Sequence, residues 1–244
     1  MNKIIDRVTV TGADDSTDIG LLKKIHEQFP FVEFGILMSR KCFGMPRFPS
    51  KEWLSKLDDA YCYEGISFSA HLCGEYVRDL LQGKNYHEIA DTLGLETPLF
   101  HRVQLNTHGI KHKFNTDSVH DLLQTADFNG QHYIFQQDGA NDKLRDCVLD
   151  FNVQSKHFLF DLSHGAGVVP KDWPARIEGK YCGYAGGLSP ENVAGEPAKL
   201  ENLLTTATAG WIDAETKLRS DDNRTFELYK VRQFLTAAEP WVKQ

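Results

Sequence analysis

The segment YAGGLSPENV, residues 184–193, decides the fold. A short strand at residues 181–185 runs into Gly186 and Gly187, and Ser189 with Pro190 then has the pattern of an N-cap and a first helical residue. Paired glycines let a backbone approach a ligand closely and turn its N–H groups outward, and a helix N-terminus attracts anions. The segment predicts a strand-to-helix turn that binds phosphate. A tight turn that simply needs glycine is the alternative.

The rest of the chain repeats this strand-then-helix pattern. Apolar or alternating stretches predict strands at residues 7–11, 32–38, 65–70, 102–105, 131–136, 157–162, 181–185 and 210–214. Helical spacing predicts helices at residues 18–29, after Ser50, at 73–81, 87–93, 117–125 and 141–151, after Ser189, and at 226–237, with at most a short turn after the sixth strand. Eight such units predict an α/β fold, a (β/α)8 barrel with a closed parallel sheet that forms one domain over residues 1–244.

Composition narrows the class of protein. The chain has 244 residues, 41% hydrophobic and 25% charged, which is typical of a globular domain. A net charge of −7 provides no global field that would attract nucleic acid or an anionic membrane. Residues 1–7 lack the apolar core of a signal peptide, and no apolar run approaches the ~18 residues of a membrane span. We therefore expect a cytoplasmic protein with neither nucleic-acid nor membrane partners.

Cysteine usage agrees with this location. The five cysteines are Cys42, Cys62, Cys73, Cys147 and Cys182. Their number is odd, their spacing is wide and no C-x-x-C motif occurs, so reduced thiols are expected.

Polar residues gather where the predicted strands end. In a barrel of this kind, the carboxyl ends of the strands and the loops after them form the active site. The residues at these ends are Thr11, Asp14, Asp15, Ser39, Arg40, Lys41, His71, Asn106, Gln136, Gln137, Asp138, Asp161, Ser163, His164, Gly186, Gly187, Asp213 and Glu215. Among them, His71, Asn106, Asp213 and Glu215 are expected to contact a substrate.

The segment at residues 184–193 closely resembles the phosphate loop of phosphoribosylanthranilate isomerase, a ribulose-phosphate-binding barrel of tryptophan biosynthesis. Other segments agree in order, and they are RVTVTG (7–12), FGIL (34–37), PRFPS (46–50), RVQLN (102–106), FLFD (158–161), GAG (165–167) and DW (172–173). The resemblance covers most of the chain in patches. It implies the barrel fold and an isomerase that acts on an aminoaldose phosphate.

The resemblance also implies roles for single residues. Asp161 matches the family's general acid, and Arg47 matches the loop arginine that holds the substrate carboxylate. The family's general base is a cysteine, but Thr11 stands in its place, and a threonine hydroxyl is a weak base. Either Asp14 or Asp15 supplies a carboxylate instead, or both form a turn and cap the helix near Ser16.

The eighth strand departs from the family as well. The family has a turn rich in glycine and serine, whereas this chain has Lys217 and Arg219. These two cations either bind the phosphate together with Gly186, Gly187 and Ser189, or they lie on the solvated surface. Glu215 is either a second acid–base group or an ion-pair partner of Lys217.

These observations predict an acid–base isomerase of a small phosphorylated sugar or sugar-amine that needs no cofactor. One alternative is a homologue that binds phosphosugars without catalysis. Another is a metal-assisted epimerase or lyase, in which His71 and His164 would join Asp161 or Asp138 as ligands. The histidine spacing shows no metal-binding motif, so no metal is expected. With the general base replaced, we expect poor conversion of phosphoribosylanthranilate itself.

Overall fold

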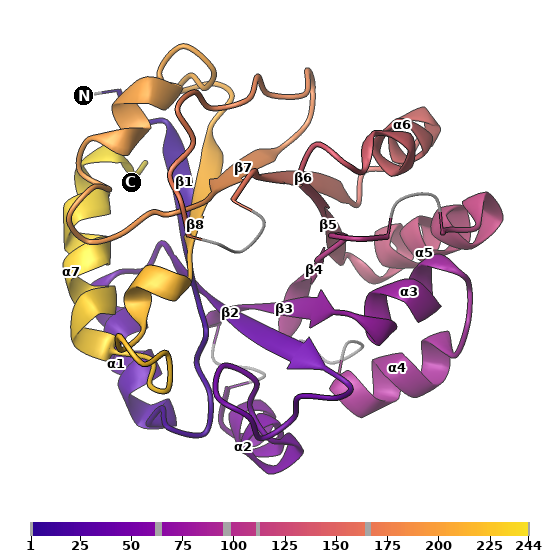
Figure 1. Ribbon diagram of the computed structural model, residues 1–244, viewed down its shortest axis with the longest axis horizontal. Helices are drawn as coiled ribbons and strands as arrows, with labels where there is room; N and C mark the ends of the chain where they lie inside the picture. Colours follow the sequence, from indigo (N-terminus) through magenta and orange to yellow (C-terminus); the bar gives the residue numbers. More distant parts are fainter. Residues whose placement is uncertain (1, 62–64, 95–98, 111–112, 164–166, 244) are drawn as a thin grey trace.

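A computed structural model describes residues 2–61, 65–94, 99–110, 113–163 and 167–243. Eight parallel strands form a closed barrel in which each strand pairs with the next and β8 returns to β1. The strands are β1 (Ile5–Thr11), β2 (Val32–Ser39), β3 (Ser67–Cys73), β4 (Phe100–Leu105), β5 (His132–Gln137), β6 (Lys156–Asp161), β7 (Cys182–Ala185) and β8 (Gly210–Ala214). Every predicted strand is present, and the predicted (β/α)8 barrel is confirmed (Figure 1).

Helices surround the barrel and cover its outer face (Figure 1). They are α1 (Ile19–Gln28), α2 (Lys51–Tyr61), α3 (Glu75–Leu81), α4 (Tyr86–Leu93), α5 (Thr116–Asn129), α6 (Asp142–Asp150) and α7 (Leu228–Ala238). Caps start two of them, because Asp18 accepts a hydrogen bond from the N–H of Gly20 and Ser50 accepts one from the N–H of Trp53. The extra helix expected between the third and fourth strands is α4.

Two crossovers carry no α-helix in the part of the chain that the structure describes. The connection from β6 to β7 is irregular there, in agreement with its weak helical pattern. The helix predicted after Ser189 is wrong, because residues 190–195 form turns and a short 3-10 helix, η1 (Glu196–Leu200), follows. The cap itself exists, since the N–H of Val193 bonds to the carbonyl of Ser189 at 3.0 Å. Gly195 and Pro197 disfavour an α-helix here, so the segment forms turns and the short 3-10 helix instead.

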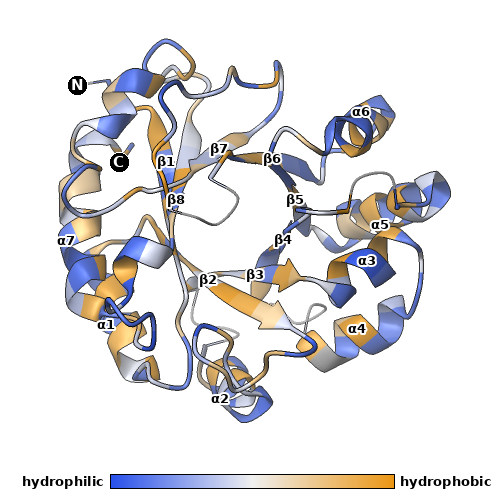
Figure 2. Cartoon of the chain, viewed as in Figure 1, coloured by the Kyte–Doolittle hydropathy of each residue, from blue (hydrophilic) through white to orange (hydrophobic). Residues whose placement is uncertain are grey.

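The main hydrophobic core lies between the barrel and its helices. The helices are striped blue and orange in Figure 2, as expected for helices with one buried face. Strand β2 is buried along its whole length, because one face packs on helices and the other faces the barrel interior. Among the described residues, no helix combines the length and apolar character needed to cross a bilayer. The four cysteines that the structure describes are free thiols, and Cys62 lies outside those residues.

Charged and aromatic side chains fill the amino-terminal half of the barrel interior. Glu33 accepts hydrogen bonds from Arg7 and Arg102, each at 2.9 Å, and is 1% exposed. The Arg102 guanidinium lies 4.3 Å from the centre of the Trp211 ring. This layer fills the amino-terminal half of the barrel interior, and a cavity opens at the carboxyl ends of the strands.

Candidate functional site

A cavity of about 250 Å³ opens at the carboxyl ends of the strands. Its volume suits a small metabolite. Its lining residues are Leu37, Arg47, Phe48, His71, Cys73, Gln104, Asn106, His108, Gln136, Leu159, Asp161, Ser163, Gly167, Ala185, Gly186, Gly187, Leu188, Asp213, Ala214, Glu215, Thr216 and Lys217. The cavity therefore brings together Asp161 and all the substrate-contact residues expected from the sequence.

Asp213, near the end of β8, is a carboxyl group that the cavity reaches and the barrel buries. Its side chain lines the cavity although the residue is only 6% exposed. The Thr11 hydroxyl donates a hydrogen bond of 2.9 Å to Asp213 Oδ1. The pKa of Asp213 is raised to about 7, mainly by burial and also by the charges of Glu33 and Asp161, while the hydrogen bond from Thr11 and the charge of Arg102 oppose the rise. Asp213 can therefore exchange a proton near neutral pH.

Asp161 ends β6 and lines the same cavity. Three donors hold its carboxylate: the Gln136 amide at 3.0 Å, the Ser163 hydroxyl at 2.6 Å and the Ser163 N–H at 3.1 Å. Such a set of donors fixes the direction of the Asp161 carboxylate. Asp161 and Asp213 are thus two carboxyl groups of one cavity in different surroundings.

His71 lies inside the barrel rather than in a loop after it. Strand β3 extends to Cys73, three residues beyond the predicted end, because its register with β2 continues to Ser39. Burial lowers the pKa of His71 to about 4, so the imidazole is neutral at neutral pH. Its Nε2 lies 3.0 Å from the Ser69 hydroxyl.

An amide wall, formed by Gln104, Asn106 and Gln136, lies across β4 and β5. The Gln104 amide donates to Asn106 Oδ1 at 2.9 Å, and the Asn106 amide donates to the Cys73 sulfur at 3.0 Å. Burial raises the pKa of the Cys73 thiol to about 11, which keeps it protonated and unreactive. Sequence reasoning missed Gln104 and Cys73 at this site, although the inward alternation that leads to Asn106 and His71 also includes them.

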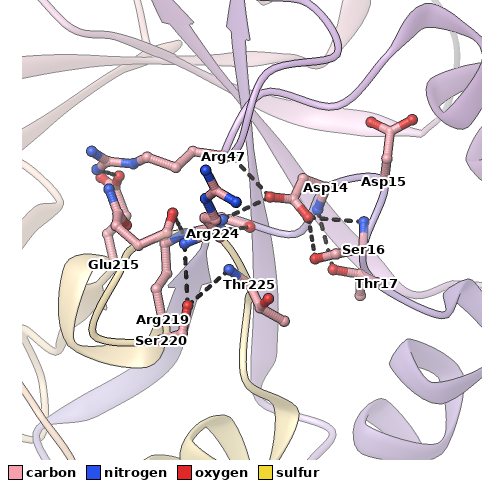
Figure 3. Close-up of polar contacts among 12 residues, drawn as sticks. Asp14, Asp15, Ser16, Thr17, Arg47, Glu215, Arg219, Ser220, Arg224 and Thr225 are labelled. Carbon is pink, nitrogen blue, oxygen red and sulfur yellow. Dashed lines mark hydrogen bonds and ion pairs between the residues drawn. The ribbon is translucent and has the colours of Figure 1, made fainter.

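Asp14 and Arg219 do not line the cavity, which corrects two expectations (Figure 3). They form a buried ion pair at 2.7 Å, and the Arg219 guanidinium also bonds to the Gly12 carbonyl. Asp14 Oδ2 further accepts the Arg47 N–H at 2.8 Å, and these donors lower the pKa of Asp14 against its burial. The pair ties the loop after β1 to the loop after β8, so neither residue reaches a ligand.

Asp15 and Thr11, two further candidates from the sequence, do not line the cavity either. Asp15 accepts hydrogen bonds from the N–H and hydroxyl of Ser50 and anchors the start of α2. Thr11 does not line the cavity, since its hydroxyl is bonded to Asp213 instead. The Thr11 side chain therefore supports a carboxyl group.

Arg47 and Glu215 form an ion pair at the mouth of the cavity, and both line it. Glu215 therefore pairs with Arg47 and not with Lys217, the partner that the sequence suggested. Lys217 lines the cavity, is exposed and forms no ion pair within the described residues. Of the two cations expected at the phosphate, Lys217 is the one that lies at the cavity.

Gly186 and Gly187 line the cavity and also contact the loop after β6. Their φ angles are 125° and 62°. A Cβ on Gly187 would lie 2.3 Å from the N atom of Val169, so the close approach of this loop by itself requires glycine. The Ser189 N–H donates to Asn192 Oδ1 at 2.9 Å, and Ser189 is not among the lining residues. The double glycine thus remains a phosphate candidate, whereas Ser189 shapes the turn.

The residues present do not favour a metal site. Within the described ranges, no three His, Cys, Asp or Glu side chains are grouped to hold a metal ion. His164 lies outside those ranges, and Asp138 is bonded to His108 at 2.8 Å and to Asn141 at 2.6 Å.

The comparisons with known proteins agree on the fold. No protein-family model matches the sequence, and no curated protein is significantly similar to it. Triosephosphate isomerase from Bartonella henselae is similar in structure, with a TM-score of 0.54, 14% identity and coverage of 97% of this chain and 98% of that chain.

Two further structures are similar over nearly all of both chains. D-psicose 3-epimerase from Clostridium cellulolyticum H10 has a TM-score of 0.52 and 11% identity, covering 97% of this chain and 96% of that chain. 3-Hexulose-6-phosphate synthase from Salmonella typhimurium has a TM-score of 0.54 and 8% identity, covering 96% of this chain and 99% of that chain. The class that these observations define is the (β/α)8 barrel, and the cavity at the carboxyl ends of its strands is lined by Asp161, Asp213 and the Glu215 that pairs with Arg47.

Proposed function

We propose that this protein is an acid–base isomerase or epimerase of a small phosphorylated sugar or sugar-amine. The observation that carries the proposal is the pair of carboxyl groups in one cavity. Asp213 is buried and titrates near neutral pH, while Asp161 is held by three donors. Two carboxyl groups of one site that lie in different surroundings are a common basis for acid and base roles.

The proposed chemistry moves one proton from carbon and another to oxygen. In this proposal Asp161, which the family resemblance matches to a general acid, acts as the base, and its carboxylate removes the proton from the carbon next to a carbonyl group. Protonated Asp213 donates its proton to the carbonyl oxygen, which gives an enediol. Protonated Asp161 then returns its proton to carbon, and the Asp213 carboxylate takes a proton back from an enediol hydroxyl, so both groups return to their starting forms. Neutral His71 and the amide wall offer hydrogen bonds to the hydroxyl groups of the substrate. No redox or metal step is needed.

The phosphate of the substrate is assigned to the side of the cavity formed by β7 and β8. Gly186, Gly187 and Lys217 line that side, where barrels of this class often hold phosphate. Arg47, now paired with Glu215, is a candidate for a second anionic or polar group of the substrate. Sugar and phosphosugar enzymes occur among the chains that share this fold, which supports the assignment.

The test combines ligand binding with a direct assay of proton transfer. Aldose and ketose phosphates are screened by thermal shift, because a ligand that binds the folded state raises its melting temperature. Ligands that bind are then incubated with the protein in D2O, and deuterium incorporation at carbon is followed by NMR. We expect exchange with a sugar phosphate and poor turnover of phosphoribosylanthranilate.

The matched variants are Asp161→Asn, Asp213→Asn and Asp59→Asn, the last on the exposed surface of α2. The first two should reduce exchange about 10²–10⁴-fold, the third should not, and Asp161→Asn should melt within a few degrees of the natural protein. If no sugar phosphate shifts the melting temperature or exchanges deuterium, or if both cavity variants stay fully active, the proposed function is wrong.

A further inference from the structure

The hydroxyl of Thr11 and the carboxyl of Asp213 form an isolated buried contact at the upper end of β1 and β8. Thr11 Oγ1 donates to Asp213 Oδ1 at 2.9 Å, and the two residues are 1% and 6% exposed. Among the described residues, Asp213 has no other hydrogen-bond partner. The contact fixes one carboxyl oxygen and leaves Oδ2 to hold a proton that the cavity can exchange.

A glycine in the neighbouring strand, β2, makes this contact possible because it has no side chain. Gly35 lies between Thr11 and His71 in the middle of β2. A Cβ at Gly35 would lie 2.2 Å from Thr11 Oγ1 and within 2.9 Å of two atoms of the His71 ring. Contacts this short do not occur, so any side chain at position 35 would displace both residues. Thr11 from β1 and His71 from β3 therefore occupy the space that a side chain at position 35 would take.

We infer that Thr11 is a positioning residue that holds the Asp213 carboxyl at the cavity, and that Gly35 supplies the space in which it does so. The inference rests on the proposed function insofar as Asp213 is taken as the proton donor. It gives the threonine that stands in place of the family's cysteine a role in orienting an acid, not in removing a proton.

Other elements around Asp213 also affect its charge. After burial, which raises the pKa most, the charges of Glu33 from β2 and Asp161 from β6 raise it, and Arg102 from β4 lowers it. His71 from β3 is neutral at neutral pH. The hydrogen bond that the Thr11 hydroxyl donates favours the ionised form of Asp213. Removing that hydroxyl should raise the pKa of Asp213 and loosen the side chain.

The experiment follows the carboxyl itself and needs no substrate. Protein that carries ¹³C-labelled aspartate is titrated by NMR, and the Asp213 signal is assigned by its loss in Asp213→Asn. Thr11→Val, which keeps the shape and removes the donor, should raise the midpoint by about one pH unit. Thr11→Ser should restore it. Thr9→Val is the matched control, because Thr9 lies on the same strand and face but donates to Glu33 at 2.9 Å.

A midpoint that Thr11→Val leaves unchanged, or that Thr9→Val raises equally, overturns the inference. If Thr11→Val does not fold, Gly35→Ala decides, because it should displace Thr11 and raise the same midpoint. The titration also separates the two proposals. A midpoint that shifts as expected in a protein without deuterium exchange contradicts the proposed function alone, whereas an unchanged midpoint in an active enzyme contradicts this inference alone.

Discussion

Asp213 illustrates at the residue scale how a buried carboxyl group reduces the stability of the fold at neutral pH. A carboxyl group whose pKa is raised by burial binds its proton more tightly in the folded than in the unfolded state. Its contribution to the free energy of unfolding is complete below pH 4 and is lost as the pH rises through about 7. A natural residue that destabilises the fold at neutral pH is commonly kept for function.

We predict that Asp213→Asn stabilises the protein at pH 8. A rise in pKa from 3.8 to about 7 corresponds to about 4 kcal/mol above neutral pH, and asparagine avoids this cost while it can still accept the Thr11 hydrogen bond. The gain should vanish near pH 4. Urea unfolding at both pH values measures it, with Asp59→Asn as the surface control. A variant that is less stable than the natural protein at pH 8 would show that partners stabilise the ionised Asp213 carboxylate, so that its burial does not destabilise the fold.

The strands are the elements that the sequence predicts well, and single loops are where it fails. Inward and outward alternation locates Asp213, Asp161, His71 and Asn106 at one end of the barrel, because parallel strands share a direction. The same reasoning placed Asp14 there, but Gly12, with φ of 119°, turns the chain so that Asp14 meets Arg219. Asp14 and Arg219 are 205 residues apart in the sequence, so no local pattern could have predicted their pairing.

We expect the two cations of the loop after β8 to have different roles. Lys217 should contact the ligand, whereas Arg219 should stabilise the fold. Arg219→Met leaves the buried Asp14 carboxylate without its partner, so we predict a loss of about 3–5 kcal/mol in the free energy of unfolding. Lys217→Met, at an exposed position, should change stability by less than about 0.5 kcal/mol and weaken the binding of sugar phosphates.

Urea unfolding and titration with the sugar phosphates that pass the thermal-shift screen distinguish the two cations. Asp14→Asn added to Arg219→Met should recover part of the lost stability, because it removes the unpaired charge. If instead Arg219→Met keeps its stability and loses phosphate binding, Arg219 is the ligand contact that the sequence alone suggested.

For the whole molecule, the buried histidines inside the barrel determine the response to acid. His71 lies in the upper half of the interior, and the His157 ring lies between the rings of His132 and Tyr181, at 4.5 and 4.9 Å. Burial lowers the pKa of His71 to about 4, and burial with the charge of Arg102 lowers that of His157 to about 2. Both rings stay neutral in the fold and become charged only after unfolding.

We predict that the protein loses stability as the pH falls from 6.5 to about 4. In this range the unfolded chain gains a proton on each of His71 and His157, while the folded protein holds one on Asp213. Burial also lowers the pKa of His26 and His132, so unfolding takes up at least one net proton. Linkage converts this into at least about 1.4 kcal/mol for each pH unit. Asp213→Asn should steepen the slope and His157→Phe should flatten it, each by about 1.4 kcal/mol per pH unit, whereas His101→Gln at an exposed position should leave it unchanged. Urea unfolding between pH 6.5 and 4.5 measures all four slopes. A flat profile for the natural protein, with no change in Asp213→Asn, would mean that the interior histidines are charged in the fold.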